Sequence, residues 1–120
     1  MKPAVITDDF MKSMLTTTRP FTIVLLKKGP NYDRQSPLIW EHGRRNFSLR
    51  ADGSLAIVCP ISDESQFSGV GVFDRTIEET GAIMDGDPGV QAGIFVYELH
   101  SSRSFPGDAL PGEGVAPRTP

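Results

Sequence analysis

Four strand patterns and two helix patterns follow one another along the chain in an order that few folds accept. Short runs rich in β-branched and aromatic residues predict strands at 21–27, 54–61, 69–74 and 93–100. Helix patterns lie between the first two strands, at 35–51, and between the last two, beginning at Thr76. The sequence therefore predicts an α+β fold: a ferredoxin-like βαββαβ sandwich, with a four-stranded antiparallel sheet and both helices on one face.

The predicted helices carry signals at their ends. Thr76-Ile77-Glu78-Glu79 matches a capping box, in which the threonine and the second glutamate bond to each other's backbone amides. Asp52-Gly53 supplies a glycine cap for the first helix, and Gly86 suits a left-handed cap for the second, before Pro88 prevents continuation.

The sheet face opposite the helices has no cover within such a subunit. Phe21, Ile23 and Leu25 point to one face of the first strand and the residues between them to the other, and every strand offers apolar residues to both sides. Pro60 cannot donate a ladder hydrogen bond, so the second strand lies at an edge or ends there. Burying about 800 Å² per partner would cover the open face. We therefore expect a homodimer built through this face, a dimeric α+β barrel.

The two ends of the chain differ in composition from its middle. Residues 1–20 form an N-terminal extension in which Asp8 or Asp9 could cap a short helix. Residues 21–100 hold all the strand and helix patterns of the domain. Residues 101–120 are a proline-rich tail, expected to be an extended arm or disordered.

Composition narrows the class of protein. With 120 residues, 38% of them apolar, the chain suits one domain with its own core. Its net charge of −3, without a basic block, argues against nucleic acid and anionic membranes as partners. The start lacks the apolar core of a signal peptide, and no stretch approaches the ~18 apolar residues of a membrane span. The single cysteine, Cys59, excludes an internal disulfide and fits a reducing cytoplasm. We expect a cytoplasmic protein with Cys59 as a small core residue rather than a nucleophile.

The first helix pattern carries polar side chains on the side that should face the core. At about 100° per residue, this side holds Leu38, Ile39, His42, Gly43, Asn46, Leu49 and Arg50. His42 could be a general base in a pocket, or a core histidine bonded to a backbone carbonyl. Asn46, one turn further on, could orient a substrate or simply bond to His42. Arg45 borders the same side: it could lie on the solvated face with Arg44, or clamp an anion.

Asp87 is the carboxylate best placed to meet His42. The two helices run antiparallel in the predicted fold, so the residues after the second helix lie near the start of the first. His42 is about 10 Å along the first helix at 1.5 Å per residue, which makes contact plausible without guaranteeing it. The competing interpretation is local, because a carboxylate before Pro88-Gly89 often bonds to nearby backbone amides.

No pattern predicts a metal or a cofactor. The two histidines, His42 and His100, and the scattered carboxylates have no recognisable metal-ligand spacing. The pair Gly69 and Gly71 lacks both the third glycine and the strand-then-helix setting of a nucleotide-binding loop. We expect His100, at the end of the last strand, to be a surface residue.

From Phe21 to about Leu99 the chain resembles the YciI-like (YCII-related) family of dimeric α+β-barrel proteins. The resemblance rests on the following features in order: a helix histidine ahead of a glycine (His42 to Gly53), a strand ending in proline (Cys59-Pro60), a Gly-Val-Phe strand, a short Glu-Glu helix, and Asp87-Pro88 followed by Gly93. It implies a ferredoxin-like subunit, a dimer, and a pocket with a His–Asp pair, carried here by His42 and Asp87. The N-terminal extension, the longer loop at 28–35 and the tail depart from the family pattern.

The resemblance implies an activity as well. One branch of the family removes chloride from chlorinated hydroxyhydroquinones, and more distant proteins of the same fold include muconolactone isomerases. We therefore expect a small cofactor-independent enzyme that eliminates from, or isomerises, a hydroxylated aromatic or unsaturated acid. His42 would be the general base and Asp87 would orient it; Asn46 and Arg45 would bind substrate. A non-catalytic dimeric module that binds a small ligand, and a structural dimer in which the pair is a relic, are the alternatives.

Overall fold

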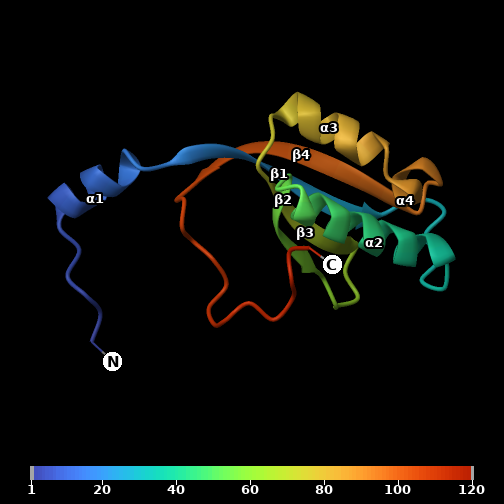
Figure 1. Cartoon of the computed structure of the whole chain (residues 1–120), viewed down its shortest axis with the longest axis horizontal. Coiled ribbons are helices and arrows are strands. Elements are labelled where there is room, and N and C mark those ends of the chain that lie inside the picture. Colours follow the sequence, from blue (N-terminus) through green and yellow to red (C-terminus); the bar gives the residue numbers. More distant parts are fainter. Residues whose placement is uncertain (1, 120) are drawn as a thin grey trace.

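The protein is a four-stranded antiparallel sheet with helices packed on one face, seen in a computed structural model that describes residues 2–119 (Figure 1). Its elements are α1 (Asp8–Leu15), β1 (Arg19–Lys28), α2 (Pro37–Ala51), β2 (Leu55–Pro60), β3 (Phe67–Phe73), α3 (Ile77–Asp85), α4 (Pro88–Gln91) and β4 (Phe95–Ser104). The strand order is β2-β3-β1-β4, and each neighbouring pair is antiparallel. The predicted α+β class is confirmed, and the arrangement is compatible with a ferredoxin-like fold.

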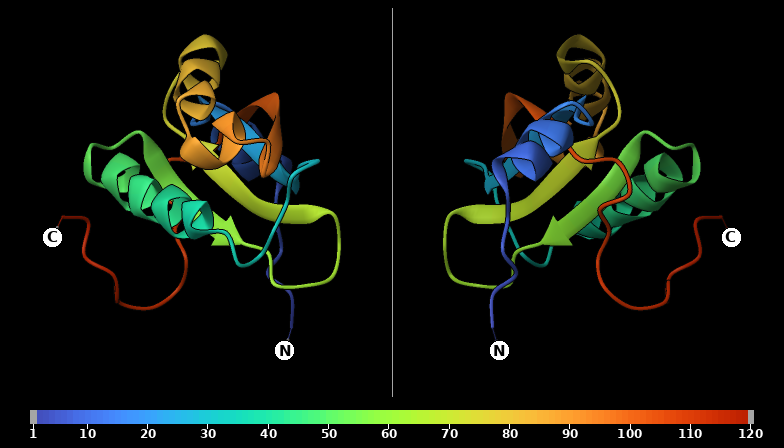
Figure 2. Two further views of the ribbon diagram at one scale, coloured as in Figure 1. Left: turned by 90° about the vertical axis from the view of Figure 1, so that its right-hand side faces the viewer. Right: turned by 90° about the vertical axis from the view of Figure 1, so that its left-hand side faces the viewer.

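The central strand β1 separates a covered face from an open one. Thr22, Val24 and Leu26 are buried, whereas Phe21, Ile23 and Leu25 between them are half-buried. Val24 and Leu26 share a core cluster with Met84 of α3, and Leu38 and Leu49 of α2 pack against the same cluster. Both helices therefore lie on one face of the sheet, as Figure 2 shows from the two ends of the molecule.

Local signals set the helix boundaries. Ser36 caps the start of α2 by accepting a hydrogen bond from the Leu38 amide, and Gly53 follows its end with φ +85°. The predicted capping box of α3 is present, with Thr76 and Glu79 bonded reciprocally. The left-handed cap predicted at Gly86 is wrong: its φ is −85°, an ordinary helical value. A short helix follows so closely that the chain does not reverse there.

That short helix, α4, was not predicted from the sequence. Asp87 is its N-cap and Pro88 its first residue, an arrangement that suits proline because the first helical amide has no intrahelical partner. Gly93, with φ +75°, then turns the chain into β4. The sequence signal was present in Asp87-Pro88, but it was interpreted as a helix end.

Strand β2 lies at an edge of the sheet, as Pro60 predicts. Cys59 pairs with Val70 of β3 and is exposed. The prediction of a buried core cysteine is therefore wrong for the single chain. Alternation along β2 places Cys59 on the opposite side from Val58, which packs against the core, so the thiol lies on the open face.

The N-terminal end of the chain extends away from the core, whereas the C-terminal tail returns to it: Arg118 donates a hydrogen bond to the carbonyl of Ala56, and Arg50 of α2 donates one to the carbonyl of Ala116. Helix α1 begins after Thr7, its N-cap, and contains no buried residue. Strands β1 and β4 pair along ten residues each, from Arg19 opposite Ser104, so regular structure reaches slightly beyond the predicted 21–100 boundaries. Residues 105–119 contain no helix or strand. Within residues 2–119, no helix combines the length and apolarity that crossing a membrane requires.

Candidate functional site

The site is built on His42 of α2 and Asp87 at the junction of α3 and α4. Nδ1 of His42 lies 2.8 Å from Oδ1 of Asp87, although the two residues are 45 positions apart. Both side chains are shielded from water, with exposed fractions of 12% for His42 and 2% for Asp87. The distance meets the hydrogen-bond condition that a general base and its orienting carboxylate require.

Each oxygen of Asp87 has its own partner. Oδ2 accepts hydrogen bonds from the backbone amides of Gly89, at 2.9 Å, and Val90, at 3.2 Å, and so caps α4. Oδ1 is therefore free to accept a hydrogen bond from His42. The two interpretations of Asp87, a histidine partner and a local turn acceptor, are both correct. The cap also fixes the carboxylate, which cannot turn away from His42 without losing two backbone bonds.

The carboxyl of Asp87 is held in its charged form. Burial by itself raises its pKa, but the hydrogen bond and charge of His42, with the amides of Val90 and Gly89, outweigh burial and place this pKa below the usual value. An ionised Asp87 has no proton to donate, so it accepts a hydrogen bond from the N–H of Nδ1. In the neutral imidazole, the proton therefore sits on Nδ1 and the lone pair on Nε2.

Asn46 faces the free nitrogen of His42. Its Nδ2 lies 3.3 Å from Nε2, and the amide donates to the lone pair of the neutral ring. This contact is longer than the Asp87 bond, so Nε2 is the more weakly held of the two ring nitrogens. The ring of Phe95 packs against the imidazole with 4.8 Å between centroids and so fixes the ring plane. His42 is thus bonded to side chains, and not to the backbone carbonyl of the alternative interpretation.

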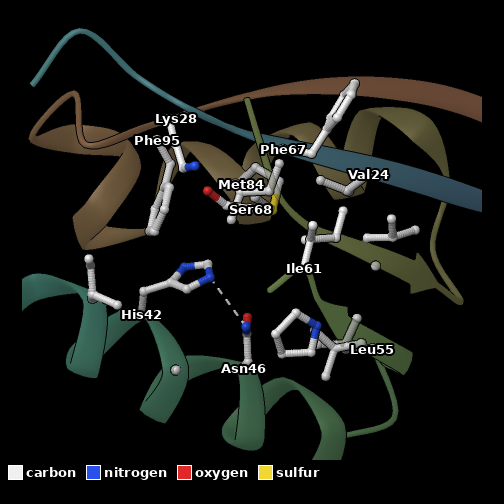
Figure 3. Close-up of a pocket in the computed structure, with 18 of the residues that line it drawn as sticks. Val24, Lys28, His42, Asn46, Leu55, Ile61, Phe67, Ser68, Met84 and Phe95 are labelled. Atoms are coloured by element: carbon white, nitrogen blue, oxygen red, sulfur yellow. Dashed lines mark hydrogen bonds between the residues drawn. The ribbon is translucent and has the colours of Figure 1, made fainter. Parts of the chain in front are cut away.

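His42 and Asn46 point into a cavity of about 410 Å³ between the sheet and α2 (Figure 3). Both helices of the core and all four strands contribute to its walls, for example through Val24, Ile39, Val58, Phe67, Met84 and Phe95. A mostly apolar cavity of this size with a few convergent polar groups is typical of small-molecule sites.

Arg45 lies outside this cavity. Its Nη1 is 3.9 Å from Oδ1 of Asp87, and its Nη2 lies close to Gly86, 3.0 Å from where a Cβ on that glycine would lie. The guanidinium therefore adds positive charge behind Asp87, and it is not among the residues that line the cavity, where an anion clamp would lie. The second histidine, His100, is exposed on β4, as predicted, and lies 3.2 Å from Glu98.

Sequence reasoning missed two charged residues of the cavity, Lys28 and Asp63. Lys28 is the last residue of β1 and lines the cavity together with Tyr32 of the following loop. The signal was the strand alternation, which puts position 28 on the same face as Val24 and Leu26. The apolar strand pattern ends at Lys27, so a strand predicted from it does not include position 28.

The chemistry open to the site is proton transfer. Within residues 2–119, no group of three or more histidine, cysteine, aspartate or glutamate side chains is arranged to hold a metal ion.

A scan against models of known protein families finds no match for the chain. A search of curated proteins likewise finds none that matches it.

Proposed function

We propose that the cavity is an active site in which His42 acts as general base and Asp87 orients it. The observation that carries the proposal is the pair itself: a buried, charged carboxylate fixes one imidazole nitrogen, and the other nitrogen faces an apolar cavity. Such an arrangement presets the tautomer that a base needs and stabilises the imidazolium formed on proton uptake.

The proposed reaction is a cofactor-independent elimination or isomerisation of a small hydroxylated aromatic or unsaturated acid. Nε2 takes a proton from a carbon next to a carbonyl, and the electron pair of the broken C–H bond moves into an enolate. In an elimination, the leaving group departs with its electron pair; in an isomerisation, the imidazolium returns the proton to another carbon. The enolate oxygen needs a donor, which Asn46 supplies once its amide turns from Nε2.

The resemblance of residues 21–99 to YciI-like proteins supports this reaction class, because His42 and Asp87 occupy the positions of the pair in that family. It also leads us to propose a homodimer formed through the open sheet face. That face carries Phe21, Ile23 and Leu25 of β1, all half-buried, and Val96 of β4, which is 41% exposed. Light scattering of the wild type and of Ile23→Glu tests the dimer: the variant should be monomeric.

A second candidate is a non-catalytic module that binds a small ligand in the same cavity. The contact of Asn46 with Nε2 favours it, because the lone pair that a base needs already has a donor 3.3 Å away. In a module of this kind, His42 would bind the ligand without taking a proton.

Turnover of chlorinated hydroxyhydroquinones and unsaturated lactones by the wild type, His42→Asn and His100→Asn tests the catalytic proposal. Chloride release and ultraviolet absorbance report the two reactions. We expect His42→Asn to lower the rate by about 10²–10⁴-fold and His100→Asn to leave it unchanged. Binding of these compounds without turnover would favour the module, and equal rates in all three proteins would contradict His42 as base.

A further inference from the structure

Lys28 brings a positive charge to the cavity, whose lining also includes the carboxylate of Asp63 and the hydroxyls of Ser62 and Ser68. It enters from β1, beside Phe95 and on the opposite side from His42, as Figure 3 shows. Among the described residues that line the cavity, it is the one lysine or arginine. Lysine ammonium groups are strongly hydrated, and a half-buried position in an apolar wall is costly unless a partner compensates.

Within the described residues, Lys28 has one hydrogen-bond acceptor and no carboxylate partner. Its Nζ donates one hydrogen bond, to the backbone carbonyl of Ser65 at 2.6 Å, and lies 5.5 Å from the centre of the Tyr32 ring. An ammonium has three donors and needs acceptors for the others. No carboxylate oxygen of residues 2–119 lies within ion-pair distance of this nitrogen.

The nearby carboxylate of Asp63 is engaged elsewhere. Its Oδ1 accepts a hydrogen bond from the backbone amide of Ser65, at 2.9 Å. Hydrogen bonds from Ser65, and the charge of Lys28 to a smaller extent, hold the pKa of Asp63 below its usual value, so this exposed group stays ionised without forming an ion pair with the lysine. Its screened charge weakens the pull of Lys28 on an anion but does not occupy the ammonium.

The preceding residue, Lys27, differs from Lys28 in having a carboxylate partner. Lys27 lies on the open face of the sheet, and its Nζ is 2.6 Å from Oε1 of Glu98. Two consecutive residues of β1 therefore point to opposite faces, one with a carboxylate partner and one without.

We propose that Lys28 is the anion-binding residue of this cavity and that its ligands are carboxylates with an apolar body, whose carboxylate lies on Lys28 while the apolar part extends along Phe95 toward His42. The proposal rests on the proposed function to the extent that the cavity binds a small molecule. It deepens that function, because it favours an unsaturated or aromatic acid over a neutral hydroxylated aromatic compound.

Phenylacetate and phenylacetamide test this choice, because they have nearly the same shape and differ in charge. Titrations of ¹⁵N-labelled full-length protein, followed by amide chemical shifts, give both dissociation constants at fixed salt. We expect the wild type to bind phenylacetate about tenfold more tightly than the amide. Lys28→Met should reduce this ratio to about one, because it keeps the aliphatic stem and removes the ammonium. The matched control Lys27→Met should keep the wild-type ratio.

Three outcomes would overturn the inference. The first is that the wild type binds the two probes equally or binds neither, and the second is that the preference for phenylacetate survives Lys28→Met. The third is that Lys28→Met weakens the binding of both probes equally, which would mean that Lys28 only holds the loop in place through its hydrogen bond to Ser65. If Lys28→Met does not fold, the wild type still decides, because added salt should weaken phenylacetate binding and leave the amide unaffected.

The failure of this inference can be told from a failure of the proposed function. If no compound is turned over but the phenylacetate preference depends on Lys28, the carboxylate site stands and catalysis does not. If a neutral hydroquinone is turned over through His42 and neither probe is preferred, catalysis stands and the carboxylate site does not.

Discussion

Residues 2–119 contain two histidine–carboxylate pairs, and they differ in almost everything except their chemistry. In the first, His42 and Asp87 are 2.8 Å apart, and the exposed fractions of their side chains are 12% and 2%. In the second, His100 and Glu98 are 3.2 Å apart, with exposed fractions of 56% and 44%. Water surrounds the second pair and is excluded from the first, so the same contact should have very different energetic consequences.

The difference originates in how each pair is assembled. Glu98 and His100 are two residues apart on one strand, where alternation puts them on the same face whatever the rest of the fold does. His42 and Asp87 are brought together by the packing of α2 against the α3–α4 junction, and the pair forms when the fold forms. A pair made by tertiary structure can be enclosed and oriented, which is what acid–base chemistry requires.

The largest effect should come from neutralising the two carboxylates in turn. Asp87→Asn replaces an acceptor by an amide donor that faces either His42 or the amides at the start of α4. We expect a loss of about 2–4 kcal/mol in the free energy of unfolding, because a buried donor is left without its partner. The matched change Glu98→Gln should leave the urea midpoint unchanged. Equal losses of unfolding free energy in the two variants would contradict the difference between the buried and the exposed pair.

A smaller loss should follow when the histidines are exchanged. His42→Asn leaves Oδ1 of Asp87 without its donor, and we expect a loss of about 1–3 kcal/mol in the free energy of unfolding. His100→Asn removes an exposed side chain and should have no measurable effect. Thermal and urea unfolding of the two variants, measured beside the wild type, give the comparison. A His42→Asn protein as stable as the wild type would show that the pair does not stabilise the fold.

The contrast between the pairs also explains how far the sequence could lead. The order of the strands and helices and the capping box at Thr76 are local patterns, so the sequence predicted the fold class and the face of α2 that carries His42 and Asn46. The antiparallel helices of that fold placed Asp87 close by. Local pattern and topology together were therefore sufficient to nominate the pair.

The remaining features depend on packing at long range. A helical wheel gives the direction of Arg45 but not the neighbour that it meets, and Asp87 rather than the cavity turned out to be that neighbour. Cys59 looked apolar in sequence, yet an edge strand with an uncovered face leaves it exposed. Lys28 became a cavity residue because β1 runs one residue further than its apolar pattern.

The stabilisation of the fold by Asp87 should depend on pH and be insensitive to salt. The folded protein lowers the pKa of Asp87 below the ordinary 3.8, so its stabilisation is complete above that value and is lost as the pH falls through the lowered pKa. The difference in unfolding free energy between the wild type and Asp87→Asn should therefore shrink as the pH falls below 3.8. Raised salt should leave it intact, since buried pairs are screened little. A difference that does not shrink below this pH would contradict the assignment.

The subtlest contrast is in the position of one proton on each ring. Asp87 accepts a hydrogen bond from Nδ1 of His42, whereas Glu98 faces Nε2 of His100, so the neutral rings should adopt opposite tautomers. Long-range ¹H–¹⁵N spectra of the neutral rings distinguish the two nitrogens. We expect His42 to keep its proton on Nδ1 in Asn46→Ala, because the 3.3 Å contact at Nε2 does not fix the tautomer, and to lose this preference in Asp87→Asn. A wild-type His42 protonated on Nε2 would leave the cavity facing a donor and remove the basis for proton abstraction there.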